Sequence, residues 1–254
     1  MTEFVLILLA AIAVLFGVTR WLRGTDMKQW DEPVRSGSGA SQEERFDAHA
    51  DGQSGEQRAV IAALGRLLAE ITSVPQSKRL ARMRSGMDKM MDGRAFACRF
   101  VATDAAGVAA EWVVDPGGDP ARRALYMHGG AYTAGSPLSH RSITVRFAEV
   151  TGGAVLAIDY RLMPEHPRRA GIEDCRSAYR WLIENGPEVV LPATAIFVAG
   201  DSAGANLTLS LIAWVRDQGL RAPDAAVALS PSTDSTLGSP SLKANLPTDP
   251  MLGP

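Results

Sequence analysis

The stretch IFVAGDSAGANLTLSLIAWV, residues 196–215, decides the fold class. Its first four residues are apolar and strand-like, and from Asn206 to Val215 the apolar residues are spaced as in a helix. Between them lies GDSAG, residues 200–204, whose small residues permit a sharp backbone turn at Ser202. A Gly-x-Ser-x-Gly sequence between a strand and a helix is typical of a serine nucleophile. We therefore predict that Ser202 is a nucleophile at the start of a helix, where free N–H groups can bind an oxyanion.

A second motif, His128-Gly129-Gly130-Ala131-Tyr132, follows the short apolar run Leu125 to Met127. Glycines after a strand let the backbone turn its N–H groups toward the developing negative charge of a tetrahedral intermediate. Alone, this motif is equally compatible with a simple glycine turn. Its position upstream of Ser202 favours an oxyanion-binding loop.

The rest of the chain predicts the architecture around these motifs. Phe96 to Thr103 and Ala109 to Val114 have the pattern of two strands joined by a turn. Beyond Met127, strands alternate with helices of ten or more residues, which predicts an α/β fold with a mostly parallel sheet and helices on both faces. The expected segments are helices from about Ser139, 171–185 and 202–218, strands 154–159, 195–199 and 225–229, and a terminal loop over 240–254.

These motifs together resemble the hormone-sensitive-lipase-like branch of the α/β-hydrolases, also called bacterial family IV esterases. Within that branch the chain is similar to esterases and lactone hydrolases that act on monoterpene ε-lactones. The resemblance covers residues 58 to 252 and rests on the segments HGGAY (128–132), DYRLMPEHP (159–167), ED (173–174), GDSAGANL (200–207), LSP (229–231) and DPML (249–252).

The resemblance implies a carboxylic ester hydrolase with no metal or organic cofactor, acting through an acyl-serine at Ser202. It implies an oxyanion hole made by the backbone N–H groups of Gly129, Gly130 and Ala203. His128 would brace that loop and would not be the general base. Residues 160–167 would form a supporting loop, and the helices within 58–92 would form part of a cap over the acyl pocket.

The general base and the acid of such a site are expected after the nucleophile in the chain. All four histidines precede Ser202, however. We therefore expect a domain that lacks its last strands and is inactive or weakly active, with 225–229 as an exposed hydrophobic edge. His140 or His166 could substitute as the base, although nothing in the sequence indicates it.

The rival interpretation is a non-catalytic, membrane-tethered binding protein. Asp201 is expected to be structural.

The N-terminal segment predicts a membrane anchor. Phe4 to Val18 is an uninterrupted run of apolar residues and glycine. Extended to Leu22, it would form a helix of roughly 28 Å, enough to cross a bilayer core. Arg20, Arg23 and Lys28 follow it, which favours an uncleaved anchor with the domain on the cytoplasmic side. A signal sequence or a buried helix is the alternative. The predicted organisation is an anchor over 1–23, a flexible linker over 24–57 and a hydrolase domain over 58–254.

The composition is that of an ordinary globular protein, with 46% hydrophobic and 21% charged residues. A net charge of −2 gives no electrostatic reason to expect a nucleic-acid partner. The pairs Lys78-Arg79 and Arg168-Arg169 are expected to be solvated surface.

Cys98 and Cys175 are far apart, so we predict two reduced thiols rather than a disulfide or a zinc site. The expected partners are small ester or lactone substrates and, through residues 4–22, a lipid bilayer.

Overall fold

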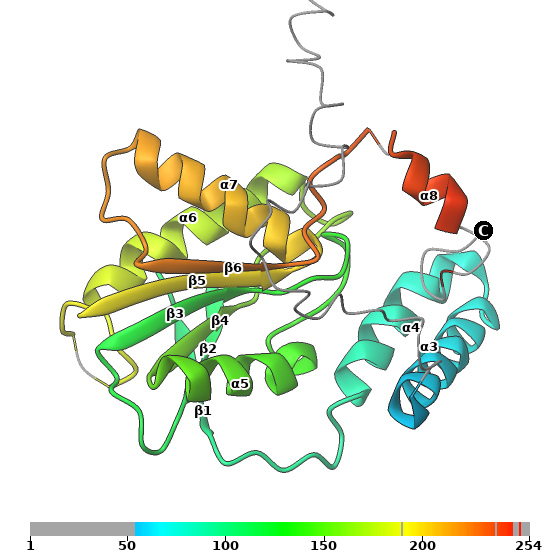
Figure 1. Cartoon of the computed structure of the whole chain (residues 1–254), viewed down its shortest axis with the longest axis horizontal. Helices are drawn as coiled ribbons and strands as arrows, with labels where there is room; N and C mark the ends of the chain where they lie inside the picture. Colours follow the sequence, from blue (N-terminus) through cyan, green and yellow to red (C-terminus); the bar gives the residue numbers. More distant parts are fainter. Residues whose placement is uncertain (1–53, 189, 237, 246–248, 250–254) are drawn as a thin grey trace, which may run out of the picture. The chain divides into compact units, whose positions relative to one another are not determined.

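The computed structural model describes residues 54–188, 190–236, 238–245 and 249, and the predicted anchor and most of the predicted linker lie outside them. Among the described helices, none combines the length and apolar character required to span a bilayer. Along the chain (Figure 1) the elements are α3 (Gly55–Thr72), α4 (Gln76–Lys89), β1 (Arg99–Asp104), β2 (Ala109–Val114), β3 (Arg122–Met127), η1 (Leu138–His140), α5 (Arg141–Thr151), β4 (Ala154–Ile158), α6 (Arg168–Glu184), β5 (Ala195–Asp201), α7 (Ala203–Asp217), β6 (Ala225–Leu229) and α8 (Pro240–Asn245).

The strands form one sheet in the order β1-β2-β4-β3-β5-β6. β1 and β2 pair antiparallel, and so do β2 and β4, whereas β3, β4, β5 and β6 are parallel to one another. The helical crossovers return each of these strands in the same direction: α5 and α7 connect neighbouring strands, whereas α6 connects β4 to β5 across β3. The predicted mostly parallel α/β fold is therefore confirmed.

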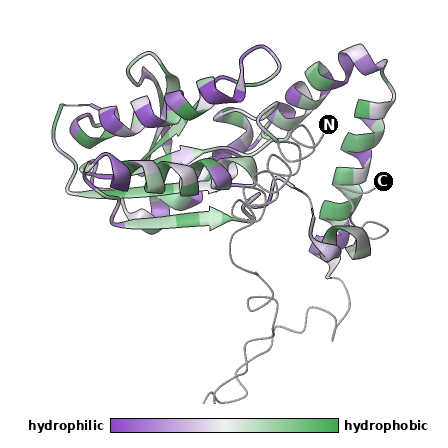
Figure 2. Cartoon of the chain, turned by 90° about the horizontal axis from the view of Figure 1, so that it is seen from above, coloured by the Kyte–Doolittle hydropathy of each residue, from purple (hydrophilic) through white to green (hydrophobic). Residues whose placement is uncertain are grey.

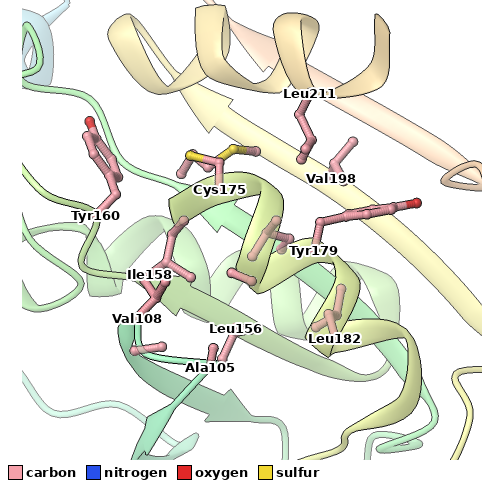
Figure 3. Close-up of a cluster of buried hydrophobic side chains, with 14 of the residues drawn as sticks. Ala105, Val108, Leu156, Ile158, Tyr160, Cys175, Tyr179, Leu182, Val198 and Leu211 are labelled. Atoms are coloured by element: carbon pink, nitrogen blue, oxygen red, sulfur yellow. The ribbon is translucent and has the colours of Figure 1, made fainter. Parts of the chain in front are cut away.

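Alternate residues of the strands supply two cores on opposite faces of the sheet. On one face α6 and α7 pack over Leu156, Ile158 and Val198, and on the other α5 packs over Ala124 and Val155. Figure 3 shows Cys175, Tyr179 and Leu182 of α6 directed toward the sheet. Each large apolar side chain that is fully buried in this way contributes about 1.5–3 kcal/mol. In Figure 2 the helices carry hydrophobic and hydrophilic stripes, which is the pattern that such layering requires.

Two sequence-based expectations about elements are corrected. The segment after Ser239 contains α8, although its proline and serine content predicted only loop. α6 begins at Arg168 rather than near Gly171, because Pro167 in an extended conformation precedes the helix and two exposed arginines form its first turn.

Other expectations are confirmed. β6 lies at an edge of the described sheet, and Val227 and Leu229 on it are 40% and 38% exposed, which is the expected exposed hydrophobic edge at 225–229. Both cysteines are buried and free.

Candidate active site

Ser202 lies on the turn between β5 and α7, at φ 52° and ψ −114°. A serine rarely adopts a positive φ, so surrounding contacts must stabilise this strained conformation. The Ser202 N–H donates to the Leu229 carbonyl oxygen at 2.8 Å, and the Ser202 carbonyl accepts from the N–H groups of Asn206 and Ser232, both at 3.2 Å. The side chain is exposed. The predicted sharp turn is confirmed, and it presents the Ser202 hydroxyl at the carboxyl edge of the sheet.

The loop after β3 has an unusual run of left-handed residues. Gly130, Ala131 and Tyr132 have φ values of 112°, 53° and 61°. Only glycine fits at residue 130, because a Cβ atom there would lie 2.2 Å from the carbonyl oxygen of Ala134. Among the described residues, nothing accepts a hydrogen bond from the N–H of Gly130 or Ala131. Unpaired N–H groups on consecutive residues are suited to bind an anion.

Gly129 does not fit the role of oxyanion donor that the family resemblance implied for it. Its N–H donates to Oδ1 of Asp201 at 2.9 Å and is therefore already paired in this structure. The candidate donors are instead Gly130, Ala131 and Ala203. Ala203 is the first residue of α7, and a helix leaves its first N–H groups without an intrahelical acceptor. Ala131 was missed because alanine gives no sequence signal for a positive φ.

The Asp201 side chain connects the end of β5 to the loop after β3, which contains Gly129, Gly130 and Ala131. Its Oδ1 also accepts from the Tyr126 hydroxyl at 2.7 Å, and its Oδ2 lies 3.5 Å from Nε2 of His140. Burial tends to raise the pKa of Asp201, but the contacts with His140, Tyr126 and Gly129 outweigh it and hold that pKa below its usual value. The carboxylate is thus an ionised anchor for the loop, as the predicted structural role requires.

His128 is fully enclosed beneath the loop. Its Nδ1 lies 2.7 Å from the Gly129 carbonyl oxygen, which can only accept, so Nδ1 carries the proton. Its ring stacks on Tyr160, with centroids 4.3 Å apart, and the Tyr160 hydroxyl donates to the His128 carbonyl at 2.7 Å. Burial lowers the pKa of His128 to about 4, although its bond with Gly129 opposes the shift. A neutral, enclosed ring fits the predicted bracing role.

Neither His140 nor His166 is hydrogen-bonded to Ser202. His140 is buried and its two ring nitrogens face Ser139, Ser136 and Asp201, while His166 is exposed. Within the described ranges, no hydrogen bond joins Ser202 to a histidine. The described contacts therefore give no support to a substitute base.

Two further segments contact the loop. Arg84 of α4 donates to the carbonyl oxygens of Thr133 (2.7 Å) and Met163 (2.9 Å) and pairs with Glu165 at 2.8 Å. The Met163 N–H in turn donates to the Tyr132 carbonyl at 2.8 Å. Residues 160–167 therefore support the loop as predicted. That α3 and α4 form a cap over an acyl pocket stays a prediction.

Arg168 is a site residue that sequence reasoning missed. Its guanidinium lies over the Tyr132 ring at 4.3 Å, and Nη2 donates to the Tyr132 hydroxyl (3.0 Å) and to Oδ1 of Asn206 (2.9 Å). The Tyr132 hydroxyl itself donates to Asn206 at 3.0 Å. Arg168 is exposed, as expected, but these bonds also connect it to both the loop and α7.

The sequence of this chain matches a known protein family and several curated proteins. Residues 124–253 match the model of a family described as alpha/beta hydrolase fold. An acetyl-hydrolase of Streptomyces hygroscopicus is 45% identical over 125 residues, which are 49% of this chain and 40% of that protein. Carboxylesterase NlhH of Mycobacterium tuberculosis is 36% identical over 121 residues, which are 48% of this chain and 38% of that protein.

Solved structures agree with the sequence matches. An esterase of the bacterial hormone-sensitive lipase family has a TM-score of 0.70 and 32% identity, over 79% of this chain and 65% of that one. An esterase/lipase from an uncultured bacterium has a TM-score of 0.66 and 36% identity, over 78% and 66%. The match to this chain spans about two fifths of the length of the curated relatives and about two thirds of the solved ones. The chain belongs to the alpha/beta hydrolase fold family and has esterases of the hormone-sensitive-lipase type among its relatives.

Proposed function

We propose that this chain is a serine-dependent hydrolase of carboxylic esters, including lactones, that works through an acyl-serine at Ser202. The observation that carries the proposal is the strained Ser202 turn beside the unpaired N–H groups of Gly130 and Ala131. Nucleophile and anion-binding donors are the two parts that acyl transfer needs together. The names of the matched relatives, acetyl-hydrolase and carboxylesterase, support the same reaction class. The motifs shared with monoterpene ε-lactone hydrolases support the inclusion of lactones, which are cyclic esters.

In the proposed reaction the Ser202 oxygen attacks the acyl carbonyl carbon and forms a tetrahedral intermediate. The negative charge on the former carbonyl oxygen would be bound by the N–H groups of Gly130, Ala131 and Ala203. Collapse of the intermediate leaves an acyl-serine and expels the alkoxide, which leaves as the alcohol with the proton that the Ser202 hydroxyl gave up. Water then cleaves that ester, releasing the acid and restoring the Ser202 hydroxyl. We assign no general base, because no histidine in the described ranges is bonded to Ser202.

Labelling with a fluorophosphonate tests this proposal directly. A fluorophosphonate forms a covalent bond with an activated serine oxygen and releases fluoride, so intact-protein and peptide mass spectrometry locate the adduct. We expect one adduct, on Ser202, that forms slowly because no general base is assigned, and no adduct in Ser202→Ala. The variant Ser210→Ala removes another exposed serine of α7 and should label as the parent does. A folded chain without an adduct on Ser202 would contradict the enzyme proposal in favour of the non-catalytic binding protein.

We further propose that residues 4–22 anchor the protein in a bilayer, with the hydrolase domain on the cytoplasmic side. This proposal rests on the sequence alone, namely the apolar run and the basic residues that follow it. Deleting residues 1–30 is expected to move the protein from the membrane pellet to the supernatant after ultracentrifugation. Deleting residues 36–53, in the predicted linker, should leave it in the pellet. A protein that stays in the membrane fraction without residues 1–30 would refute the anchor.

A further inference from the structure

Arg168 is held in a fixed position between the two halves of the candidate site. Tyr132, on the loop, lies beneath its guanidinium, and Asn206, one turn into α7, accepts from its Nη2 atom. Asn206 is fixed in turn, since its Nδ2 donates to the Ser232 carbonyl at 2.8 Å. Within the described part of the chain, Nε and Nη1 of Arg168 have no acceptor, and the side chain is exposed. A guanidinium oriented by stacking, with free donors, is preorganised to bind a carboxylate.

The carboxylates nearest to Arg168 in the sequence are bound to other arginines. Glu165 pairs with Arg84 at 2.8 Å and Glu173 pairs with Arg176 at 2.9 Å. Asp174 accepts from Arg161 at 2.6 Å. No described carboxylate lies within ion-pair distance of Arg168, whose partners are a phenol and an amide. Its positive charge is therefore not neutralised by any carboxylate of the described residues.

The position of Arg168 relative to Ser202 sets the length of ligand that reaches it. Asn206 is one helical turn after Ser202, and its N–H donates to the Ser202 carbonyl. One turn of 5.4 Å, the Asn206 side chain and one hydrogen bond separate the guanidinium from the nucleophile, a path on the order of 10 Å. An acyl carbon at Ser202 and a carboxylate at Arg168 would thus be joined by a short chain of about two to four carbons.

We propose that Arg168 is a binding residue that gives this site a preference for anionic esters, in which a free carboxylate lies a few carbons from the ester carbonyl. The ligand class is the monoester of a short dicarboxylic acid, such as glutaric or adipic acid. The inference rests on the proposed function, since it takes Ser202 as the point at which the ester carbonyl binds. The proposal adds one requirement to the proposed function: the preferred ester carries a free carboxylate, which ester hydrolysis itself does not require.

Binding is measured without turnover, so that this proposal and the proposed function fail separately. The 254-residue chain with Ser202→Ala is titrated by NMR with monoethyl glutarate and with ethyl glutaramate, its neutral amide analogue. We expect the anionic ester to bind up to about fivefold more tightly, which is the upper end of what an exposed ion pair contributes. The ratio of the two dissociation constants measures the preference for the anionic ester. Arg168→Leu should abolish this preference, and Arg168→Lys should retain part of it.

Arg169→Leu is the matched control. It removes the same charge from the adjacent position, where Arg169 is 87% exposed and 3.8 Å from Glu173. The ratio of the affinities for the two esters should be the same in Arg169→Leu as in the parent. Equal binding of the two esters, binding of neither, or a ratio that Arg168→Leu leaves intact would overturn the proposal. A merely structural Arg168 would weaken both esters alike. Hydrolysis of ethyl glutaramate by the chain with Ser202 intact reports on the proposed function independently.

Discussion

Replacing Gly204 by alanine is expected to destabilise the domain by about 3 kcal/mol or more, measured by urea unfolding followed by tryptophan fluorescence. A Cβ atom at residue 204 would lie 1.9 Å from the carbonyl oxygen of Met127 and 2.6 Å from that of His128. Both atoms are backbone, at the carboxyl end of β3, and cannot rotate away as a side chain could. The start of α7 would have to move off the sheet, together with the turn that carries Ser202.

Gly65→Ala is the control for this variant. Gly65 lies inside α3, and nothing is within 4 Å of the position that its Cβ atom would occupy. The same chemical change should therefore stabilise the protein slightly, because alanine is favoured over glycine in a helix by about 1 kcal/mol. If Gly204→Ala unfolds at the same urea concentration as the parent, the close contact between α7 and β3 is not as described.

The fold was largely predictable from the sequence because its signals are local. Hydrophobic runs bounded by turn residues located β2 and β6 at their observed bounds, and the alternation of strands and helices predicted the parallel sheet. The bounds were less accurate where the local signal was weak. β3 begins at Arg122, three residues before the predicted run, because Arg123 is buried and donates to the carbonyl oxygens of Leu182 and Ile183. An arginine in that environment has no sequence signature.

The candidate site was predictable only in part, because its geometry depends on contacts between distant residues. The turn at Ser202 follows from five adjacent residues and was confirmed. The assignment of Gly129 as a donor was wrong because its N–H is bonded to Asp201, 72 residues later. Arg168 was overlooked for the same reason, since its partners Tyr132 and Asn206 lie 36 and 38 residues away in opposite directions. Two adjacent arginines look equivalent in the sequence, and only their contacts distinguish them.

Removing the Asp201 carboxylate is expected to slow fluorophosphonate labelling of Ser202 by about 10²-fold, comparable to the loss of one oxyanion donor. In Asp201→Ala, the Gly129 N–H and the Tyr126 hydroxyl lose their common acceptor. A buried donor without an acceptor costs about 1–3 kcal/mol, so we also expect a measurable loss of stability. The loop would relax to satisfy these donors, and the N–H groups of Gly130 and Ala131 would no longer be held beside Ser202.

Asp201→Asn separates the shape of this side chain from its charge. Its amide oxygen can still accept from Tyr126 and Gly129, while its amide nitrogen would face His140, so labelling should fall only about tenfold. Asp217→Ala removes a carboxylate at the far end of α7 whose ion-pair partner among the described residues is the adjacent Arg216, and it should label as the parent does. If Asp201→Ala is folded and labels at the parental rate, the carboxylate does not position the loop.

The pH dependence of the same contact provides an independent test. The pKa of Asp201 is held below its usual value in the folded protein, so the unfolded chain binds more protons as the pH falls below roughly 4. The stabilisation by Asp201 is therefore complete above that pH and is lost as the pH falls through the folded pKa. The difference in unfolding free energy between the parent and Asp201→Asn should accordingly narrow below about pH 4, because protonation gives the parent the same neutral group. A difference that stays constant from pH 7 to pH 3 would mean that Asp201 acts through its shape, and that its negative charge does not hold the loop.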